Sequence, residues 1–236
     1  MKRQDAADLA GSVGLGAWAA FGLLAMLVIG HDGAPLSPDD QVLAWSLHHR
    51  SDHLVALARG VTATGTGVVP YVLVVLAGLL AGRSVRQRLA AVALGVFCLA
   101  AGQALRYGVM LLVQRPRPPH ADWATHASGW SFPSGHTTTA ALAAIVVSVA
   151  LRVRVPRGHA LLTGVVPLWG LAVGLTRAEL AVHWCTDVLG GWLFAIGWSG
   201  LCLCAASWWL PEQFIPRMPH TAADPAEGHA RQDPDC

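Results

Sequence analysis

Charged residues are scarce in this chain. Asp, Glu, Lys and Arg make up 13% of its 236 residues, whereas about 25% is usual for a soluble domain. The deficit is uneven, because the charges gather in short segments between long apolar runs. That pattern is typical of a protein that crosses a membrane several times. The net charge of +2 gives no indication of nucleic-acid binding.

The chain also lacks the cysteine spacing of a metal site or a disulfide framework. Four of its five cysteines fall in apolar segments and the fifth ends the chain. The only close pair, Cys202 and Cys204, would point to different faces of a helix. We interpret the cysteines as small apolar residues and expect neither a metal nor another cofactor. His48, His49 and His53 could suggest a metal patch, but the polar face of an interfacial helix is the better interpretation.

Six apolar runs are long enough to cross a membrane, because about 20 residues at 1.5 Å each cover roughly 30 Å of hydrocarbon. They lie at about residues 11–30, 60–82, 89–113, 137–155, 160–178 and 184–210. No small-residue cleavage site follows the first run, so we expect it to be retained and not removed as a signal peptide. The sequence therefore predicts an all-α, polytopic membrane helix bundle.

The segments outside these runs are more polar. Residues 37–57 begin with a helix-start pattern but are too polar to span, so we expect a helix that lies at the interface in the first outer loop. The segment at 211–236 holds five prolines and many polar residues, which predicts a disordered tail. These expectations give a cytoplasmic N-terminus at 1–10, one helical domain at 11–210 and a cytoplasmic tail.

The distribution of lysine and arginine predicts the orientation. Eight of these residues lie on the side of the two termini and five on the opposite side. Cytoplasmic loops carry the excess of positive charge, so we expect both termini in the cytoplasm and a location in a bacterial inner membrane. The loops at 31–58, 114–136 and 178–183 would then face the outside, or periplasm.

Two of these outward segments hold nearly all of the unusual polar residues. Arg117 and Arg177 suit a tetrahedral phosphate, because arginine supplies planar, permanently charged donors. Ser134 and Gly135 stand where the fourth span begins, and the free N–H groups of a helix N-terminus favour an anion. Each feature alone has a plainer interpretation, such as a headgroup contact, but ionisable residues gathered on one membrane face indicate a functional site.

His183 and Asp187 are four residues apart, so on a helix they would share a face. A carboxylate at that distance can fix the tautomer of the imidazole and activate its other nitrogen as a nucleophile. The pair could also be structural and cap a helix. His136, from the other segment, is then free to act as a general acid.

The sequence resembles the type 2 phosphatidic acid phosphatases, the PAP2 superfamily. That family has three motifs: Lys-x6-Arg-Pro, Pro-Ser-Gly-His and Ser-Arg-x5-His-x3-Asp. The second is complete at Pro133–His136, and the third is present with Thr176 in place of serine. Motif order, spacing and the six spans match over nearly residues 11–210. The resemblance implies a metal-independent phosphatase in which His183 forms a phosphohistidine, Asp187 orients it and His136 protonates the leaving group. It also implies that the phosphate oxygens are held by Arg117, Arg177, Ser134 and Gly135.

The first motif is incomplete, because Met110 stands seven residues before Arg117 where the family has lysine. Arg106 lies one helical turn deeper, about 6 Å along the axis, and could snorkel outward. Helical side chains lean toward the N-terminus, however, which here is away from the outer face. We therefore expect Arg115, already at the right depth, to be the better substitute, with Arg106 as support. The loss of the lysine should weaken phosphate binding or narrow the substrate range.

The leading hypothesis is a lipid phosphate or pyrophosphate phosphatase that takes its substrate from the bilayer. Candidate substrates are undecaprenyl pyrophosphate, phosphatidylglycerol phosphate and phosphatidic acid. A lipid A phosphatase is one alternative. Another is a non-catalytic lipid-binding or transport descendant, which Met110 motivates but the intact His136, His183 and Asp187 oppose.

Overall fold

The computed structural model describes residues 3–154 and 160–209. Within these ranges the chain is helical and contains no strand. The helices are α1 (Arg3–Gly30), α2 (Ser37–His49), α3 (Asp52–Ala63), α4 (Val68–Ala81), α5 (Val85–Val113), the short η1 (His120–Asp122), α6 (Gly135–Arg154), α7 (Ala160–Glu179) and α8 (Cys185–Trp209). The predicted all-α class is confirmed. The predicted disordered tail at 211–236 lies outside the described residues.

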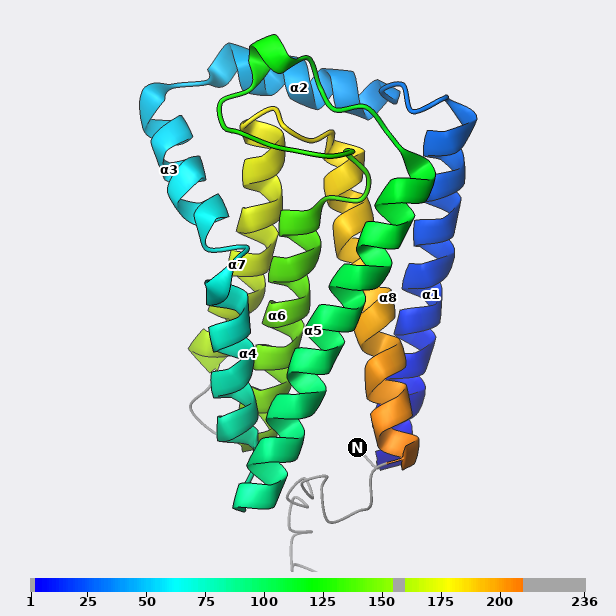
Figure 1. The fold of residues 1–236 in the computed structure, drawn as a ribbon, viewed down its shortest axis with the longest axis vertical. Coiled ribbons are helices and arrows are strands. Elements are labelled where there is room, and N and C mark those ends of the chain that lie inside the picture. Colours follow the sequence, from blue (N-terminus) through cyan, green and yellow to red (C-terminus); the bar gives the residue numbers. More distant parts are fainter. Residues whose placement is uncertain (1–2, 155–159, 210–236) are drawn as a thin grey trace, which may run out of the picture.

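Five of the described helices, α1, α5, α6, α7 and α8, are long and apolar enough to cross a membrane. The pair α3 and α4, bent by 50° at a short break, makes a sixth span when it is counted as one. The predicted bundle of six spans is therefore confirmed, with one span broken. The long helices run side by side, and α2 lies across one end of the bundle (Figure 1).

The expected interfacial helix at 37–57 is not continuous. It ends at His49, and a new helix, α3, begins at Asp52. The Ser51 side chain accepts a hydrogen bond from the Leu54 N–H, which is the usual way for serine to start a helix. The prediction missed this boundary, so the segment after Ser51 belongs to the broken span and not to the helix at the interface.

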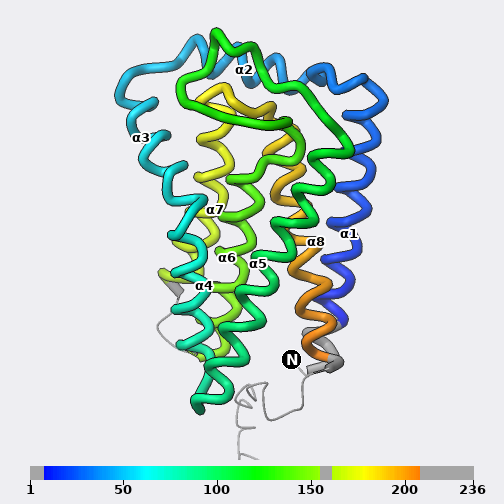
Figure 2. The backbone as a smooth tube through the Cα atoms, in the orientation of Figure 1, coloured from blue at the N-terminus to red at the C-terminus, as the bar shows by residue number. Residues whose placement is uncertain are grey.

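Apolar side chains on the outside of the bundle fit a membrane environment. Leu15 is 72% exposed and Leu112 is 84% exposed, which would be unfavourable in water but matches lipid tails. Between helices, small residues allow close approach. A Cβ atom at Gly14 of α1 would lie 3.0 Å from the Cα atom of Gly200 in α8. The first and last spans therefore pack directly on each other, as Figure 2 shows.

The three loops expected to face outward all lie at the end of the bundle that α2 covers (Figure 1). They are the connection from α1 to α2, the long segment between α5 and α6, and the turn between α7 and α8. Below them, Phe21, Phe132 and Phe194 form an apolar cluster, in which the rings of Phe21 and Phe132 stack at 5.6 Å. This cluster anchors the Pro133–His136 motif, which directly follows Phe132.

Candidate active site

His183 and Asp187 lie together where α8 begins. The distance between His183 Nδ1 and Asp187 Oδ2 is 3.4 Å, and both side chains are buried. The spacing predicted a shared helix face, but His183 lies in the turn before α8 and the carboxylate turns back to it from the first helical turn. Asp187 Oδ2 also accepts a hydrogen bond from the Trp184 N–H at 2.9 Å. The carboxylate thus fixes the turn that carries the histidine.

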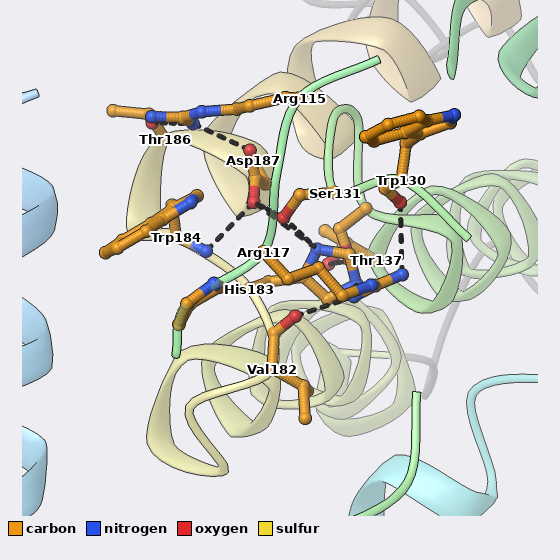
Figure 3. A network of polar contacts seen from close by, with 12 residues as sticks. Arg115, Arg117, Trp130, Ser131, Thr137, Val182, His183, Trp184, Thr186 and Asp187 are labelled. Carbon is orange, nitrogen blue, oxygen red and sulfur yellow. Dashed lines mark hydrogen bonds and ion pairs between the residues drawn. The ribbon is translucent and has the colours of Figure 1, made fainter. Parts of the chain in front are cut away.

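Ser131 joins this pair from the loop before α6. Its hydroxyl donates a short hydrogen bond to Asp187 Oδ2 and lies 3.4 Å from His183 Nδ1 (Figure 3). Ser131 is fully buried. The sequence analysis missed this residue, because it belongs to no motif and an isolated serine in a loop carries no signal of its own.

Arg117 faces the other nitrogen of the catalytic histidine candidate. Its Nη1 atom lies 2.9 Å from His183 Nε2 and 2.6 Å from the Val182 carbonyl oxygen. Backbone carbonyls of residues 128–130 hold the rest of the guanidinium (Figure 3). An arginine N–H only donates, so Nε2 carries a lone pair and the ring proton is on Nδ1, facing Asp187.

Burial lowers the pKa of His183 from the ordinary 6.5 to about 4. The hydrogen bond with Asp187 opposes this shift, and the positive charges of Arg117 and Arg177 add to it. His183 is therefore neutral at pH 7, with its Nε2 lone pair directed at the arginine. Neutral imidazole with an oriented proton is the form that a histidine nucleophile requires.

His136 and Arg177 reach the same region from neighbouring helices. His136 is the second residue of α6, and its Nε2 lies 3.4 Å from Thr66 Oγ1 in the break between α3 and α4. Arg177, in the last turn of α7, donates to Thr62 Oγ1 at 3.1 Å, while its buried Nε has no partner among the described residues. Three arginines, Arg177, Arg117 and Arg106, lie near enough to His136 for their positive charges to interact with its imidazole.

The start of α6 is tied to the start of α8. The Ser134 N–H donates to the Asp187 carbonyl oxygen at 3.1 Å, and the Ser134 hydroxyl accepts from Thr137 Oγ1 at 2.9 Å. Ser134 is fully buried. Gly135 borders a guanidinium, since a Cβ atom there would lie 3.4 Å from Arg106 Cζ. The two predicted phosphate-binding segments are therefore in contact.

Arg115 does not fit the predicted phosphate-binding role. It is fully buried, with Nη1 2.7 Å from Asp187 Oδ1 and Nη2 2.7 Å from Asp39 Oδ2. Its Nε donates to the Gly33 carbonyl oxygen at 3.3 Å. The cause is the chain direction after α5, where Gln114 adopts a left-handed conformation with φ 48°. Every nitrogen of this guanidinium already donates to protein oxygens, behind the Asp187 carboxylate.

Comparison with known proteins places this geometry in a family. Residues 90–211 match the PAP2 superfamily. The chain belongs to the PAP2 superfamily. It is 28% identical over 175 residues to phosphatidylglycerophosphatase B of Bacillus subtilis. That alignment covers 71% of this chain and 81% of the Bacillus protein. It is 34% identical over 137 residues to decaprenylphosphoryl-5-phosphoribose phosphatase of Mycolicibacterium smegmatis, covering 57% of this chain and 69% of that protein.

A solved structure has the same fold. It is the crystal structure of a transmembrane PAP2-type phosphatidylglycerolphosphate phosphatase from Bacillus subtilis, with a TM-score of 0.67 and 22% sequence identity. The match covers 83% of this chain and 94% of that one. The expected membership is confirmed, and the chain is a membrane-bound phosphatase of the PAP2 superfamily.

In this PAP2 protein, the Arg106 side chain contacts Met110, the residue that stands where the family has lysine. The Arg106 Nη1 atom lies 3.3 Å from Met110 Sδ, one turn closer to the end of α5 that lies near α2. The guanidinium therefore points toward the C-terminal end of α5, and the expected lean toward the helix N-terminus was wrong for this side chain. A long side chain can reverse that lean to bring its charge to a polar region. This geometry favours Arg106, which borders Gly135, over Arg115, which lies behind Asp187, as the substitute for the lysine.

Arg106 and Arg117 lie close to each other. Burial is the main cause of the lowered pKa of Arg117, the positive charge of Arg106 lowers it further, and the negative charge of Asp187 opposes the shift. Within residues 3–154 and 160–209, no group of three or more His, Cys, Asp or Glu side chains is arranged to hold a metal ion.

Proposed function

We propose that this protein removes phosphate from a lipid phosphate or pyrophosphate without a metal, through a phosphohistidine at His183. One observation carries the proposal most directly. His183 presents an unprotonated Nε2 to Arg117 while its Nδ1 side is held by Asp187 and Ser131. A neutral nucleophile that faces cationic donors is suited to attack a phosphorus atom whose oxygens those donors bind.

In the first step, His183 Nε2 attacks phosphorus and the bond from phosphorus to the lipid oxygen breaks. The phosphate dianion bound beside His136 offsets the arginine charges and favours the protonated imidazole. That proton passes to the leaving oxygen, so the lipid departs as an alcohol or, from a pyrophosphate, as a monophosphate. The imidazole becomes positively charged, and Asp187 stabilises that charge through Nδ1–H. Arg117 and Arg177 balance the negative charge on the phosphoryl oxygens.

In the second step, water attacks the phosphohistidine. His136, now unprotonated, takes a proton from the water, and the bond from phosphorus to Nε2 breaks. Inorganic phosphate leaves, and both histidines return to their starting states. General acid–base catalysis of this kind contributes about 10²–10⁴ in rate.

Arg106 is the cation that we propose in place of the family lysine. Its guanidinium is next to Gly135 and Met110, and its buried Nε has no partner among the described residues. Three arginines and two histidines then meet with Asp187 as the nearby carboxylate. Such an excess of positive charge favours a dianionic phosphate, and the N-terminus of α6 adds to it.

The position of the site supports a lipid substrate. It lies at the end of the bundle that α2 covers, between membrane-spanning helices, so an amphiphile could keep its tail in the bilayer. The names of the relatives point to a glycerolipid phosphate and to a polyprenyl-linked phosphate. We propose phosphatidylglycerol phosphate, undecaprenyl pyrophosphate and phosphatidic acid as the substrates to compare. We further propose that residues 11–210 form the catalytic domain, with both termini cytoplasmic and the site outside an inner membrane.

The test is phosphate release by purified protein in detergent with excess EDTA, with each of these three lipids as substrate. We expect release that survives EDTA and is lost in His183→Ala, and the preferred lipid identifies the pathway. Loss of activity in EDTA that added divalent metal restores would contradict the metal-independent mechanism. No release from any lipid would favour a non-catalytic descendant of the family, and equal release by His183→Ala would require another nucleophile.

A further inference from the structure

A buried ion-pair chain connects α2 to the catalytic carboxylate. Asp39, in the first turn of α2, lies 2.7 Å from Arg115 Nη2, and Arg115 Nη1 lies 2.7 Å from Asp187 Oδ1. The side chains of all three residues are fully buried. Asp187 in turn contacts His183 through its other oxygen. The helix that lies across the end of the bundle (Figure 1) is therefore two ion pairs away from the nucleophile.

Asp39 also fixes the backbone that carries Asp187. Its Oδ1 accepts a hydrogen bond from the Thr186 N–H at 2.9 Å and lies 3.2 Å from Cys185 Sγ. These are the first two residues of α8, and a carboxylate at a helix N-terminus is favoured by the free N–H groups there. Burial alone would raise the pKa of Asp39, but hydrogen bonds from Thr186 and Leu36 and the pair with Arg115 lower it below its ordinary value. Asp39 is therefore ionised at neutral pH.

The charge balance gives Asp39 a part in the chemistry. Arg115 touches the carboxylate that must stabilise the His183 imidazolium (Figure 3). An unbalanced cation at that point would weaken the attraction of Asp187 for the proton on Nδ1, and an unpaired buried charge is costly. Because Asp39 pairs with the same guanidinium, the three groups together keep one net negative charge. That negative charge is available to His183.

We propose that Asp39 is a positioning residue for the hydrolytic reaction, acting through Arg115 to hold Asp187 in place and to preserve its charge. The inference rests on the proposed nucleophilic role of His183. It makes α2 a part of the active site, and not only a helix at the membrane surface. Asp39 itself touches no part of the phosphate-binding cluster formed by Arg106, Arg117 and Arg177 in the described contacts, so its effect falls on the turnover step and not on substrate binding.

The test compares Asp39→Asn with Asp40→Asn, since Asp40 is the adjacent residue of the same type and is exposed. Both are assayed for kcat, KM and thermal midpoint in the same detergent. We expect Asp39→Asn to lower kcat by about tenfold or more, as loss of a residue that orients a histidine from behind commonly does. KM should stay within about twofold, and Asp40→Asn should match the wild type, because ground-state binding is unaffected. A lower thermal midpoint with unchanged kcat, or a raised KM with unchanged kcat, would overturn the proposal.

A double-mutant cycle with Arg115→Gln separates action through Arg115 from a general structural effect. In the Arg115→Gln background, Asp39→Asn should lower kcat clearly less than it does in the wild type, because the charge route through Arg115 is gone and only the hydrogen bonds of Asp39 to Thr186 remain. A further tenfold fall there would contradict the proposal, and this arm decides the matter if Asp39→Asn alone does not fold. If His183→Ala keeps the activity of the wild type, the proposed function is refuted. If His183→Ala is inactive but Asp39→Asn keeps the activity of the wild type, only this inference is refuted.

Discussion

Replacement of Arg106 by methionine should weaken the enzyme without unfolding it. Methionine is unbranched and uncharged, so Arg106→Met removes the guanidinium beside Gly135 but keeps most of the packing contacts of the side chain on α5. Replacing a buried charge that has few partners by an apolar side chain is often neutral or stabilising. We therefore expect an unchanged or slightly higher thermal midpoint, together with a loss of activity.

The size of that loss follows from the contact proposed with phosphate. A hydrogen bond to a charged group is worth about 1.5–3 kcal/mol, and about 1.4 kcal/mol corresponds to tenfold in rate. Arg106→Met should thus lower kcat/KM by about 10- to 150-fold. Arg83→Met is the matched control, because Arg83 is exposed and precedes α5 at the other end of the bundle. It should leave kcat/KM within about twofold, as surface substitutions away from a site usually do.

A second substitution, Met110→Lys, tests whether a lysine at position 110 can replace the Arg106 guanidinium. Met110→Lys restores the family lysine, but in the wild-type background it places a second cation next to Arg106 Nη1, where Met110 Sδ now lies 3.3 Å away. Like charges at that distance repel, so the single variant should be less active than the wild type. In the Arg106→Met background, the same lysine should recover most of the lost kcat/KM. Unchanged kcat/KM in Arg106→Met, or a double variant weaker than either single one, would refute the assignment.

Three further outcomes are expected from the same site. His136→Gln should lower kcat/KM for a lipid phosphate, which reports the first step, by about 10²–10⁴. It should lower kcat/KM for p-nitrophenyl phosphate far less, because nitrophenolate leaves without a proton, and an equal loss for both would contradict its role as the acid. Ser131→Ala should lower kcat by about tenfold at unchanged KM, by analogy with other residues that orient a histidine, and a normal kcat would show that its bond to Asp187 is only structural. Thermal unfolding should reveal the lowered pKa of His183, because the unfolded chain binds a proton at this residue below pH 6.5 and the folded protein only near pH 4. From pH 6.5 to 5 the wild type should therefore lose about 1.5 kcal/mol more stability than His183→Gln, and equal losses would contradict a neutral, buried His183.

The helix bundle could be predicted from the sequence because membrane spans depend on length and apolarity alone. The bounds of α7 and α8 follow directly from their apolar runs. The break between α3 and α4 was less visible, since it depends on turn formation at residues 64–67 inside an otherwise continuous apolar stretch. Similarly, the division between α2 and α3 rests on one capping serine, Ser51, which a hydropathy pattern cannot detect.

The candidate site shows the same division between pattern and geometry. Histidine and arginine residues in motifs could be identified, because their types and spacing carry chemical meaning. The positions of Arg106 and Arg115 could not be predicted, since the first depends on which way a long side chain leans on α5 and the second on the direction of the chain after the turn at Gln114. Asp39 was interpreted only as part of a helix start, because its partner Arg115 is 76 residues away in the sequence.

The most direct test of the mechanism is to trap and locate the phosphorylated residue. The protein is incubated with a substrate whose transferable phosphate is radiolabelled, quenched in alkali and digested, and the labelled peptide is identified. His136→Gln with p-nitrophenyl phosphate should accumulate the intermediate, because hydrolysis then lacks its base. We predict an acid-labile, alkali-stable label on the peptide that contains His183 and no label in His183→Ala. Label on another residue, or turnover with no labelled protein in any variant, would contradict nucleophilic catalysis by His183.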